Sequence, residues 1–342
     1  MSMTITEECP LRPTQQVVVT GGAGYIGSHL VAGLVAGGHQ VCVLDDLSTG
    51  RAARLAGQAG QAGQVRLVTG SVLDADLVER EVRNAGTVFH LAAAVGVRRI
   101  IEDPLQSLRT NLAGTENVLR ASAEHGCRVV LASSSEVYGK LGGAAMAEDG
   151  DRVLGPTTVP RWSYAAAKAV DEHLAFAYAG QGLRVSVVRY FNSYGPGLDR
   201  TGDASVVAVF LRHALAGLPI PVHGDGRQTR CLTYVSDTVR GTMLAAAVPQ
   251  AEGQVFNIGS TAETSIAELA ALVAEAAGAT VPVELTPYPY GDRFEDVRRR
   301  VPDIRLARAV LGWEPLVTLP EGLKHTIAWW TAPPGGTAGG KR

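Results

Sequence analysis

Tyr164 and Lys168 are four residues apart in a predicted helix, and a serine run followed by Glu136 precedes them in the chain. This spacing puts the two side chains on one face of a helix, one turn apart. A lysine cation lowers the pKa of a nearby phenol, so the tyrosinate can take a proton from a hydroxyl group while a hydride leaves the same carbon. An ordinary amphipathic helix is the alternative, because the spacing alone is common by chance.

A glycine-rich turn near the start of the chain supplies the partner that such chemistry needs. An apolar run at residues 17–20 leads into Gly21, Gly24 and Gly27, which open a predicted helix. The backbone N–H groups at such a helix start can bind a pyrophosphate. Asp45 ends the next predicted strand, where a carboxylate can accept hydrogen bonds from adenosine ribose hydroxyls. The pattern predicts a dinucleotide site, with a tight turn that binds nothing as the alternative.

The acid at position 45 also bears on which dinucleotide binds. A carboxylate there repels the 2′-phosphate of NADP, so NAD is the predicted cofactor. Arg51 could instead pair with such a phosphate, although its position also suits a cap over the adenosine end.

Length, composition and charge exclude several functional classes. The 342 residues are 46% hydrophobic, enough to bury a large core, and the net charge of -2 gives no basic surface for nucleic acid or an anionic membrane. The N-terminus carries acids where a signal peptide needs a basic region, and no segment approaches the roughly 20 apolar residues of a membrane span. We therefore predict a cytoplasmic protein with no nucleic-acid or membrane partner.

The cysteines are spread along the chain. Cys9, Cys42, Cys127 and Cys231 form no C-x-x-C pair, which argues against a zinc cluster or a disulfide framework. We predict that they are structural thiols and that the chain has no metal site.

Short β-branched runs alternate with helical segments through the first half of the chain. Such near-continuous apolar strands are typical of a parallel sheet covered on both faces. We therefore predict an α/β fold with a Rossmann-type doubly wound parallel sheet. The predicted strands are Val17 to Thr20, Gln40 to Leu44, Val65 to Thr69, Thr87 to Leu91, Arg128 to Ser133 and Arg184 to Arg189.

The second half has a different character. Prolines and turn dipeptides after Arg189 indicate a smaller α/β lobe over a substrate, while residues 234–259 return to a helix-plus-strand pattern. The low-complexity run at 56–64 predicts a mobile surface loop. The predicted division is a flexible N-terminus at 1–15, a nucleotide-binding domain at 16–190 with about 232–259, a sugar-binding lobe at 191–231 with about 260–330, and a disordered tail at 331–342.

Several motifs together resemble one family. They are the glycine-rich turn, Asp45-Asp46-Leu47-Ser48, His90-Leu91-Ala92-Ala93, Ser133 to Gly139, the Tyr164 and Lys168 pair, and Arg189 to Pro196. This combination is similar to the extended short-chain dehydrogenases/reductases that act on nucleotide sugars, over about Gln16 to Trp330. The resemblance implies NAD as cofactor, a UDP-sugar as substrate, and a homodimer formed through the helix after Asn111 and the helix of Tyr164.

Glu136 distinguishes reactions within that family. Simple 4-epimerases typically lack an acid there, and the 4,6-dehydratases carry an Asp-Glu pair, whereas Ser135 occupies the Asp position in this chain. The serine-glutamate run, the segment 160–164 and Gln228 to Cys231 look most like the UDP-glucuronate decarboxylases. UDP-sugar 4-epimerases and sugar 4,6-dehydratases of the same fold remain alternatives. A regulatory NAD-binding module without turnover is an alternative of another class, against which the intact Tyr164 and Lys168 argue.

The resemblance implies a reaction through C4 of the sugar. Tyr164 removes the C4 hydroxyl proton, Ser134 hydrogen-bonds that oxygen, Lys168 lowers the phenol pKa, and NAD oxidises C4. The resulting β-keto acid loses CO2 because the C4 ketone accepts the electrons as an enolate. Glu136 and Arg230 position the sugar and its carboxylate and manage the C5 proton. The product is the UDP-4-keto-pentose, UDP-xylose, or both.

The resemblance also assigns binding residues. Ser71 stands where the family usually has an Asp for the adenine amino group, and its oxygen can accept the same bond. The expected cofactor contacts are Gly21, Gly24, Tyr25, Ile26, Gly27, Asp45, Asp46, Ser48, Gly50, Arg51, Ser71, Val72, Leu91, Ala92, Ala93, Asn111, Tyr164 and Lys168. The expected substrate contacts are Ser135, Asn192, Gln228, Arg230, Arg293 and Arg300, with the last two neutralising the pyrophosphate.

Each charged candidate also has a simpler interpretation. Glu136 could be a solvated loop carboxylate, and Arg230 could form a surface ion pair. The run Arg298-Arg299-Arg300 could be a solvated face, as charge runs usually are.

Overall fold

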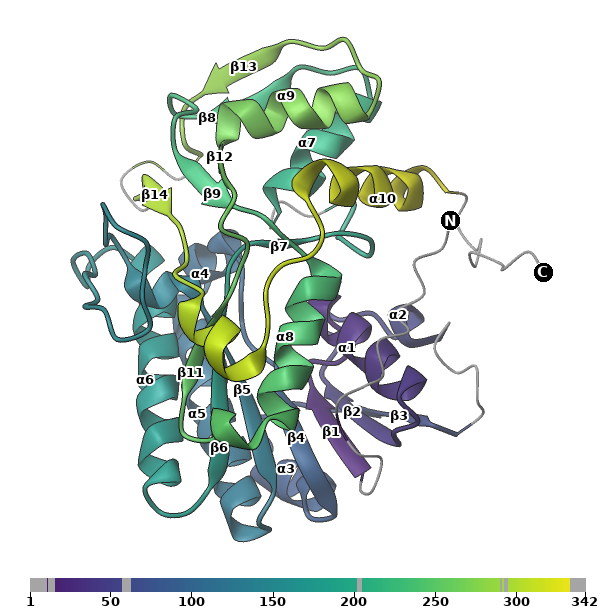
Figure 1. The fold of residues 1–342 in the computed structure, drawn as a ribbon, viewed down its shortest axis with the longest axis vertical. Helices are drawn as coiled ribbons and strands as arrows, with labels where there is room; N and C mark the ends of the chain where they lie inside the picture. Colours follow the sequence, from purple (N-terminus) through teal and green to yellow (C-terminus); the bar gives the residue numbers. More distant parts are fainter. Residues whose placement is uncertain are drawn as a thin grey trace.

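The centre of the molecule is a parallel sheet of seven strands (Figure 1). The computed structural model describes residues 11, 16–56, 63–201, 205–289, 291 and 295–332. The strand order is β11-β6-β5-β4-β1-β2-β3, with every neighbouring pair parallel. The predicted doubly wound fold is confirmed. The strands are β1 (Gln16–Thr20), β2 (Val41–Asp45), β3 (Val65–Thr69), β4 (Ala85–His90), β5 (Arg128–Ser134), β6 (Arg184–Tyr190) and β11 (Val255–Ile258).

The order of the strands locates a crevice. Going outward from β1, the chain runs through β2 and β3 on one side and through β4, β5 and β6 on the other. In such a sheet a ligand binds at the carboxyl ends of the strands, where the order reverses. β1 leads into the glycine-rich turn at this point, and β5 leads into the 3₁₀ turn η1 (Ser135–Tyr138).

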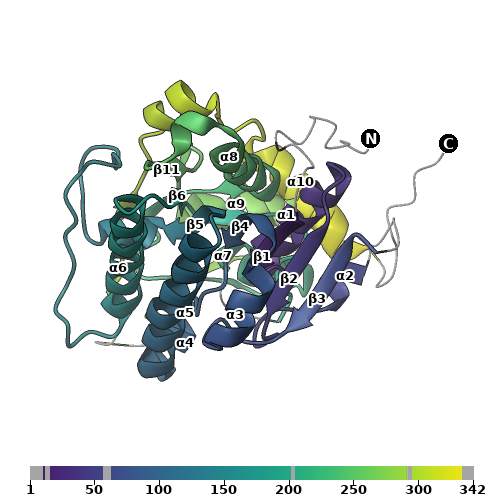
Figure 2. The ribbon, with the colours of Figure 1, turned by 90° about the horizontal axis from the view of Figure 1, so that it is seen from below.

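Helices cover both faces of the sheet, as the view from below shows (Figure 2). One face packs against α1 (Tyr25–Ala36), α8 (Val235–Ala247) and η4 (Ala307–Leu311), and its core includes Leu34 and Trp313. The other face packs against α3 (Ala75–Val82), α5 (Pro104–Glu124) and α6 (Arg161–Ala179), with Leu119 in its core. Burial of these apolar side chains on both faces is the main favourable term holding the layers together.

A smaller group of elements lies beyond the carboxyl ends of the strands, at the top of Figure 1. Its core, which includes Phe210 and Leu269, is separate from the two cores of the sheet. The division of the chain into two domains remains a prediction. The elements are α7 (Val206–Leu215), β8 (Ile220–His223), β9 (Thr229–Cys231), β12 (Glu263–Ser265), α9 (Ile266–Ala276), β13 (Val283–Thr286), β14 (Arg299–Arg300) and α10 (Leu319–Thr331).

Short elements complete the described chain. They are α2 (Ala53–Ala56), α4 (Val97–Glu102), β7 (Ser193–Tyr194), β10 (Thr233–Tyr234) and η2 (Pro249–Ala251). Asn111 lies inside α5, which begins earlier than expected because Asp103 caps it and accepts a hydrogen bond from the backbone N–H of Gln106.

Cys42, Cys127 and Cys231 are buried free thiols. Burial raises the pKa of Cys42 to about 11, which keeps the thiol protonated. Cys9, most of the low-complexity run and the tail after Ala332 lie outside the described residues. Within the described ranges, no helix is both long enough and apolar enough to cross a membrane.

Candidate functional site

A cavity of about 700 Å³ opens at the carboxyl ends of the strands. It extends from the glycine-rich turn, past the ends of β2 and β4, to η1 and the first turns of α6. The expected cofactor residues that line it are Gly21, Gly24, Tyr25, Ile26, Gly27, Asp45, Asp46, Ser48, Val72, Leu91, Ala92, Ala93, Tyr164 and Lys168. Ser134, Ser135, Glu136 and Asn192 line it as well.

The start of α1 fits a pyrophosphate. Gly24 is the N-cap, no side chain caps the helix, and no acid lies in the first turn. The backbone N–H groups and the positive end of the helix dipole are therefore directed at the cavity without a side-chain carboxylate to compete. A Cβ on Gly27 would overlap the carbonyl oxygen of Gly21, so only glycine allows this close turn.

Asp45 braces the turn and lines the same end of the cavity. Its Oδ2 accepts a hydrogen bond from the N–H of Ala23 and its Oδ1 from that of Leu47, both at 2.9 Å. Burial raises the pKa of Asp45, while these two bonds act in the opposite direction. A carboxylate has about four lone-pair sites, so it can also accept from ribose hydroxyls.

The two nearby arginines differ in position. Arg51 does not line the cavity and pairs with Asp199 at 2.9 Å, with 55% of its side chain exposed. Arg54, which sequence reasoning missed, lines the cavity and donates to the carbonyl oxygens of Ala23 and Gly197 at 3.4 and 3.1 Å. Arg54 therefore joins the glycine-rich turn to the loop after β7.

Three expected cofactor residues lie behind the cavity wall rather than in it. Ser71 Oγ accepts from the N–H of Leu73 at 3.2 Å, and its neighbours in sequence line the cavity instead. Asn111 holds Ala94, a wall residue, through both its side-chain oxygen (2.8 Å) and its side-chain nitrogen (3.3 Å). Gly50 packs directly against Asp45, where a Cβ would overlap the carboxylate.

Tyr164 and Lys168 lie one turn apart on α6, beneath the end of β5. The Ser134 hydroxyl hydrogen-bonds the Tyr164 phenol, whereas the resemblance implies that this serine binds the C4 oxygen of the substrate. Nζ of Lys168 donates to the carbonyl oxygen of Ala132 at 3.1 Å and lies 3.1 Å from Oδ2 of Asp171. Each side chain is at most 9% exposed.

The pKa of Tyr164 differs from the sequence-based expectation. It is raised instead of lowered, first by burial and then by the negative charges of Glu136 and Asp171. The bond from Ser134 acts in the opposite direction. Lys168, the cation expected to favour the tyrosinate, is paired with Asp171 at 3.1 Å.

Glu136 lies between two buried guanidinium groups. Its Oε2 is 2.6 Å from Nη1 of Arg161, and its Oε1 accepts from Nη1 of Arg300 at 2.6 Å. Burial acts to raise the pKa of Glu136, but the two arginines outweigh it and hold that pKa well below its usual value. Glu136 is therefore ionised and is an acceptor rather than a solvated loop carboxylate.

The three consecutive arginines at 298–300, the last two of which form β14, occupy three environments. Arg298 is exposed and pairs with Asp225 at 2.8 Å, whereas Arg299 pairs with Glu263 at 2.8 Å. Arg300 is only 3% exposed and points to Glu136, with its Nε and Nη2 lacking hydrogen-bond partners among the described residues. This position favours a role beside Glu136 over the pyrophosphate role that the resemblance implies.

Two further substrate candidates lie outside the cavity lining. Arg230 on β9 is held by Asp296 at 2.6 Å and by the carbonyl oxygen of Val297 at 2.7 Å, although the charge of Glu136 reaches it. Gln228 is buried and donates to the carbonyl oxygen of His223 at 2.8 Å. Arg293 lies outside the described residues.

A buried network supports η1 from behind. Glu172 on α6 pairs with Arg189 at 2.7 Å and accepts from the Ser133 hydroxyl at 2.6 Å. Arg189 also donates to the Tyr138 hydroxyl at 2.8 Å. These bonds fix the end of β5 and both ends of the segment that carries Ser134 and Glu136.

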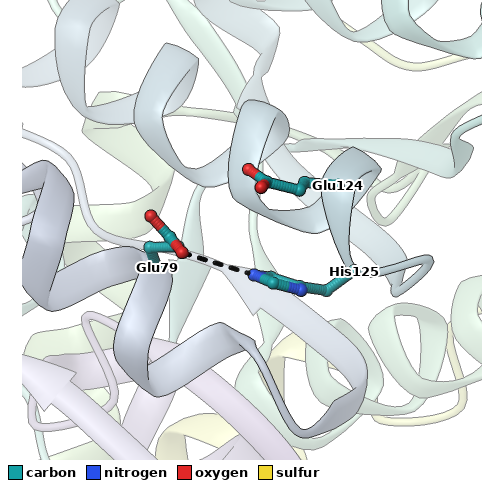
Figure 3. Close-up of side chains that lie close together, drawn as sticks. All are labelled: Glu79, Glu124 and His125. Carbon is teal, nitrogen blue, oxygen red and sulfur yellow. Dashed lines mark ion pairs between the residues drawn. The ribbon is translucent and has the colours of Figure 1, made fainter.

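A group of metal-ligand type lies away from the cavity, at the end of α5 and on α3 (Figure 3). Candidate ligand atoms of Glu79, Glu124 and His125 lie within 4.8 Å of one another. Glu79 is already engaged, because its Oε1 accepts from Arg83 at 3.1 Å and lies 3.8 Å from Nε2 of His125. We interpret the group as an ion-pair contact between the two helices.

Comparison with known proteins identifies similar chains. The family model described as the NAD dependent epimerase/dehydratase family matches residues 17–259. A UDP-N-acetyl-alpha-D-glucosaminuronate decarboxylase from Bacillus cytotoxicus is 40% identical, with 92% of this chain and 98% of the relative covered. UDP-glucuronic acid decarboxylase 1 from Xenopus tropicalis is 35% identical, with 92% and 72% covered.

Other relatives have different names. A UDP-glucose 4-epimerase from Mycolicibacterium smegmatis is 37% identical, with 92% of this chain and 98% of the relative covered. Among solved structures, MoeE5 in complex with UDP-glucuronic acid and NAD is 35% identical with a TM-score of 0.79, and the match covers 92% of this chain and 98% of that one.

Proposed function

Because the chain belongs to the NAD dependent epimerase/dehydratase family, we propose that it decarboxylates a UDP-linked uronic acid, UDP-glucuronic acid. The membership confirms the predicted family resemblance and NAD as cofactor, and the relatives named as decarboxylases at 35% and 40% identity confirm the predicted enzyme class. The predicted products are UDP-4-keto-pentose, UDP-xylose, or both.

The observation that carries the proposal is the arginine cluster around Glu136, next to the Tyr164 base. Arg161 and Arg300 both bind this carboxylate, and Arg230 lies within electrostatic reach of it. Two guanidinium groups on one carboxylate leave a net positive charge beside the sugar end of the cavity, while the charge of Arg230 is balanced by Asp296. Such a site suits a sugar that carries a carboxylate, whereas a neutral hexose gives these charges no partner.

Bound NAD supplies the oxidant for the C4 hydroxyl and the reductant that can act on the product. The glycine-rich turn would hold the pyrophosphate of NAD, and Asp45 would hold its adenosine ribose. Ser134 orients the C4 oxygen, and Tyr164, which it hydrogen-bonds, takes the hydroxyl proton. Asn192 lines the cavity and is the expected contact near the sugar phosphates.

Loss of CO2 follows from the chemistry of the oxidised sugar. A C4 ketone is β to the C5 carboxylate, so the electrons of the breaking C–C bond can move into an enolate. The ionised Glu136 accepts hydrogen bonds from the sugar and keeps the two guanidinium groups in place. Arg161 lines the cavity and is the guanidinium group placed to meet the substrate carboxylate, whereas Arg300 lies behind Glu136 and adds positive charge from there.

The test is incubation of the purified protein with NAD and UDP-glucuronic acid, with CO2 and nucleotide-sugar masses measured. Loss of CO2 with formation of a UDP-pentose or UDP-4-keto-pentose is expected. A product of unchanged mass that is the C4 epimer would favour the 4-epimerase alternative, to which the 37% identical relative points.

A second candidate is the same reaction on the 2-acetamido sugar. It is favoured by the printed name of the 40% identical relative. Parallel assays with UDP-glucuronic acid and UDP-N-acetylglucosaminuronic acid would separate the two, because the substrate with the higher kcat/KM is the one that the pocket fits.

We also propose that the chain is a cytoplasmic homodimer whose contact uses α5 and α6. The two helices pack side by side (Figure 2), and each exposes an apolar side chain, Leu105 on α5 and Val170 on α6. A mass measurement in solution tests the dimer.

A further inference from the structure

One buried carboxylate near the base has no role in the proposed mechanism. Asp171 lies one turn beyond Lys168 on α6 and is 0% exposed. Its Oδ2 is 3.1 Å from Nζ of Lys168, which is itself 2% exposed. Two charges so far from water are tolerated because each compensates the other.

A polar chain connects Asp171 to the glycine-rich turn. Thr115 of α5 acts to lower the pKa of Asp171, and its Oγ1 lies 3.1 Å from Nε2 of His90. Nδ1 of His90 lies 2.7 Å from Oγ1 of Thr20, which accepts from the N–H of Ala92 in the cavity wall at 3.2 Å. Burial and the neighbouring lysine charge lower the pKa of His90 to about 3, so the histidine is neutral at physiological pH.

Charged groups from several elements surround the base. Of these, the two whose negative charge raises the pKa of Tyr164 are Glu136 and Asp171. Glu136 is bound by arginines, whereas Asp171 is bound by the lysine that is expected to favour the tyrosinate. The charged or titratable groups are Arg99 of α4, His90 of β4, Glu136 of η1, and Arg161, Lys168, Asp171 and Glu172 of α6.

We infer that Asp171 is a positioning residue for the reaction: it fixes the Lys168 ammonium against β5 and offsets the positive charge that this ammonium presents to Tyr164. The inference rests on the proposed function, in which Tyr164 is the base. Asp171→Asn keeps the size of the side chain and removes its negative charge. Lys168 then acts on the phenol without a counterion.

The experiment measures the phenol directly. Phenolate absorbance is titrated for wild type and for Asp171→Asn, each minus the same protein carrying Tyr164→Phe, so that the difference reports Tyr164. We expect the phenol pKa to fall by roughly one unit in Asp171→Asn. The acid limb of the pH–rate profile with UDP-glucuronic acid should move to lower pH with it, because the tyrosinate then forms at lower pH.

Glu172→Gln is the matched control. It removes a buried carboxylate from the next position of the same helix, but one that pairs with Arg189 instead of Lys168. It should lower the melting temperature and shift the Tyr164 phenol pKa by less than Asp171→Asn does. An unchanged or higher phenol pKa in folded Asp171→Asn overturns the inference, and so does an equal shift in Glu172→Gln.

If Asp171→Asn does not fold, a second variant tests the same inference. Thr115→Val removes the hydroxyl that stabilises the Asp171 carboxylate, so a smaller downward shift of the phenol pKa is expected, and no shift overturns the inference. The titration needs no substrate. If the phenol pKa shifts as expected but no variant converts UDP-glucuronic acid, the effect of Asp171 on Tyr164 stands and the proposed function fails.

Discussion

The two ends of the cavity are built in different ways. At the cofactor end, the groups proposed to bind NAD come from one short segment from β1 into α1, and they are mostly backbone N–H groups exposed by glycines. At the sugar end, the polar groups belong to side chains. Glu136, Arg161 and Arg300 come from parts of the chain as much as 164 residues apart. The cofactor end can be predicted from a short stretch of sequence. The sugar end forms only when the folded chain brings distant side chains together.

This difference determines where mutations should act. A backbone site is disturbed only by added bulk, whereas a charge cluster is disturbed by loss of a single charge. The buried charges of the sugar end compensate one another, so removing one leaves the others uncompensated. Changes at the sugar end should therefore alter chemistry, and changes at the cofactor end should alter NAD affinity.

Tyr164→Phe should have the largest effect. Removal of the phenol hydroxyl takes away the proposed base, and turnover should fall by about 10²–10⁴-fold. NAD should stay bound, because the glycine-rich turn is untouched. Steady-state assays measure turnover, and an NAD titration measures cofactor binding. Full activity in this variant would show that Tyr164 is not the base.

Glu136→Gln should separate the two chemical steps. The neutral amide leaves Arg161 and Arg300 uncompensated, so decarboxylation should slow by roughly 100-fold or more, with a smaller effect on C4 oxidation. Single-turnover experiments that follow nicotinamide absorbance and CO2 release measure both steps. If C4 oxidation and decarboxylation both proceed at wild-type rates, Glu136 has only a structural role.

The same variant gives a pH test of the charge cluster. The pKa of Glu136 is lower in the folded state than its ordinary value of 4.5, so its ion pairs contribute stability above that value and lose it as pH falls further. Wild type should exceed Glu136→Gln in free energy of unfolding by about 3 kcal/mol at neutral pH. Denaturant titrations should show this gap narrowing below about pH 4.5, and a gap independent of pH would argue against the cluster.

Gly27→Ala tests the cofactor end. The new Cβ overlaps the Gly21 carbonyl, and an overpacking cost of about 1–3 kcal/mol should weaken NAD binding by about fivefold to 150-fold. Gly33→Ala on the same helix is the control, because its Cβ would make ordinary contacts with Met243. Equal NAD affinities for the two variants, measured by calorimetry, would contradict the backbone account.

Arg51→Ala should have the smallest effect. Its ion pair with Asp199 is half exposed, and such pairs contribute at most about 1 kcal/mol. NAD affinity and melting temperature should stay near wild type. A large loss of NAD affinity would show that Arg51 reaches the adenosine end after all.

The sequence was sufficient for the sheet and for the local motifs. All six strands predicted in the first half are present with bounds within two residues, because their apolar β-branched runs carry the signal of a sheet buried on both faces. The glycine-rich turn, Asp45 and the Tyr164 and Lys168 pair were readable for the same reason, since each depends on neighbours in sequence.

The residues missed are those whose partners are distant. The sequence assigned no role to Arg54 or Arg161. Arg54 contacts Gly197 and Arg161 contacts Glu136, and both partners lie in distant segments of the chain. Two signals were available, since Arg161 precedes Tyr164 by three residues and Asp171 follows Lys168 by three, which places each pair on one helix face. Their chemistry still depends on burial, which local sequence does not determine.

The measurement that tests the central claim most directly is CO2 release from UDP-glucuronic acid by the purified protein with NAD, followed by mass analysis of the nucleotide sugars. The arginine cluster beside Tyr164 predicts stoichiometric loss of CO2, with a UDP-pentose or its 4-keto form as product. Recovery of intact uronic acid, or of its C4 epimer, from a protein that binds NAD would contradict the decarboxylase account.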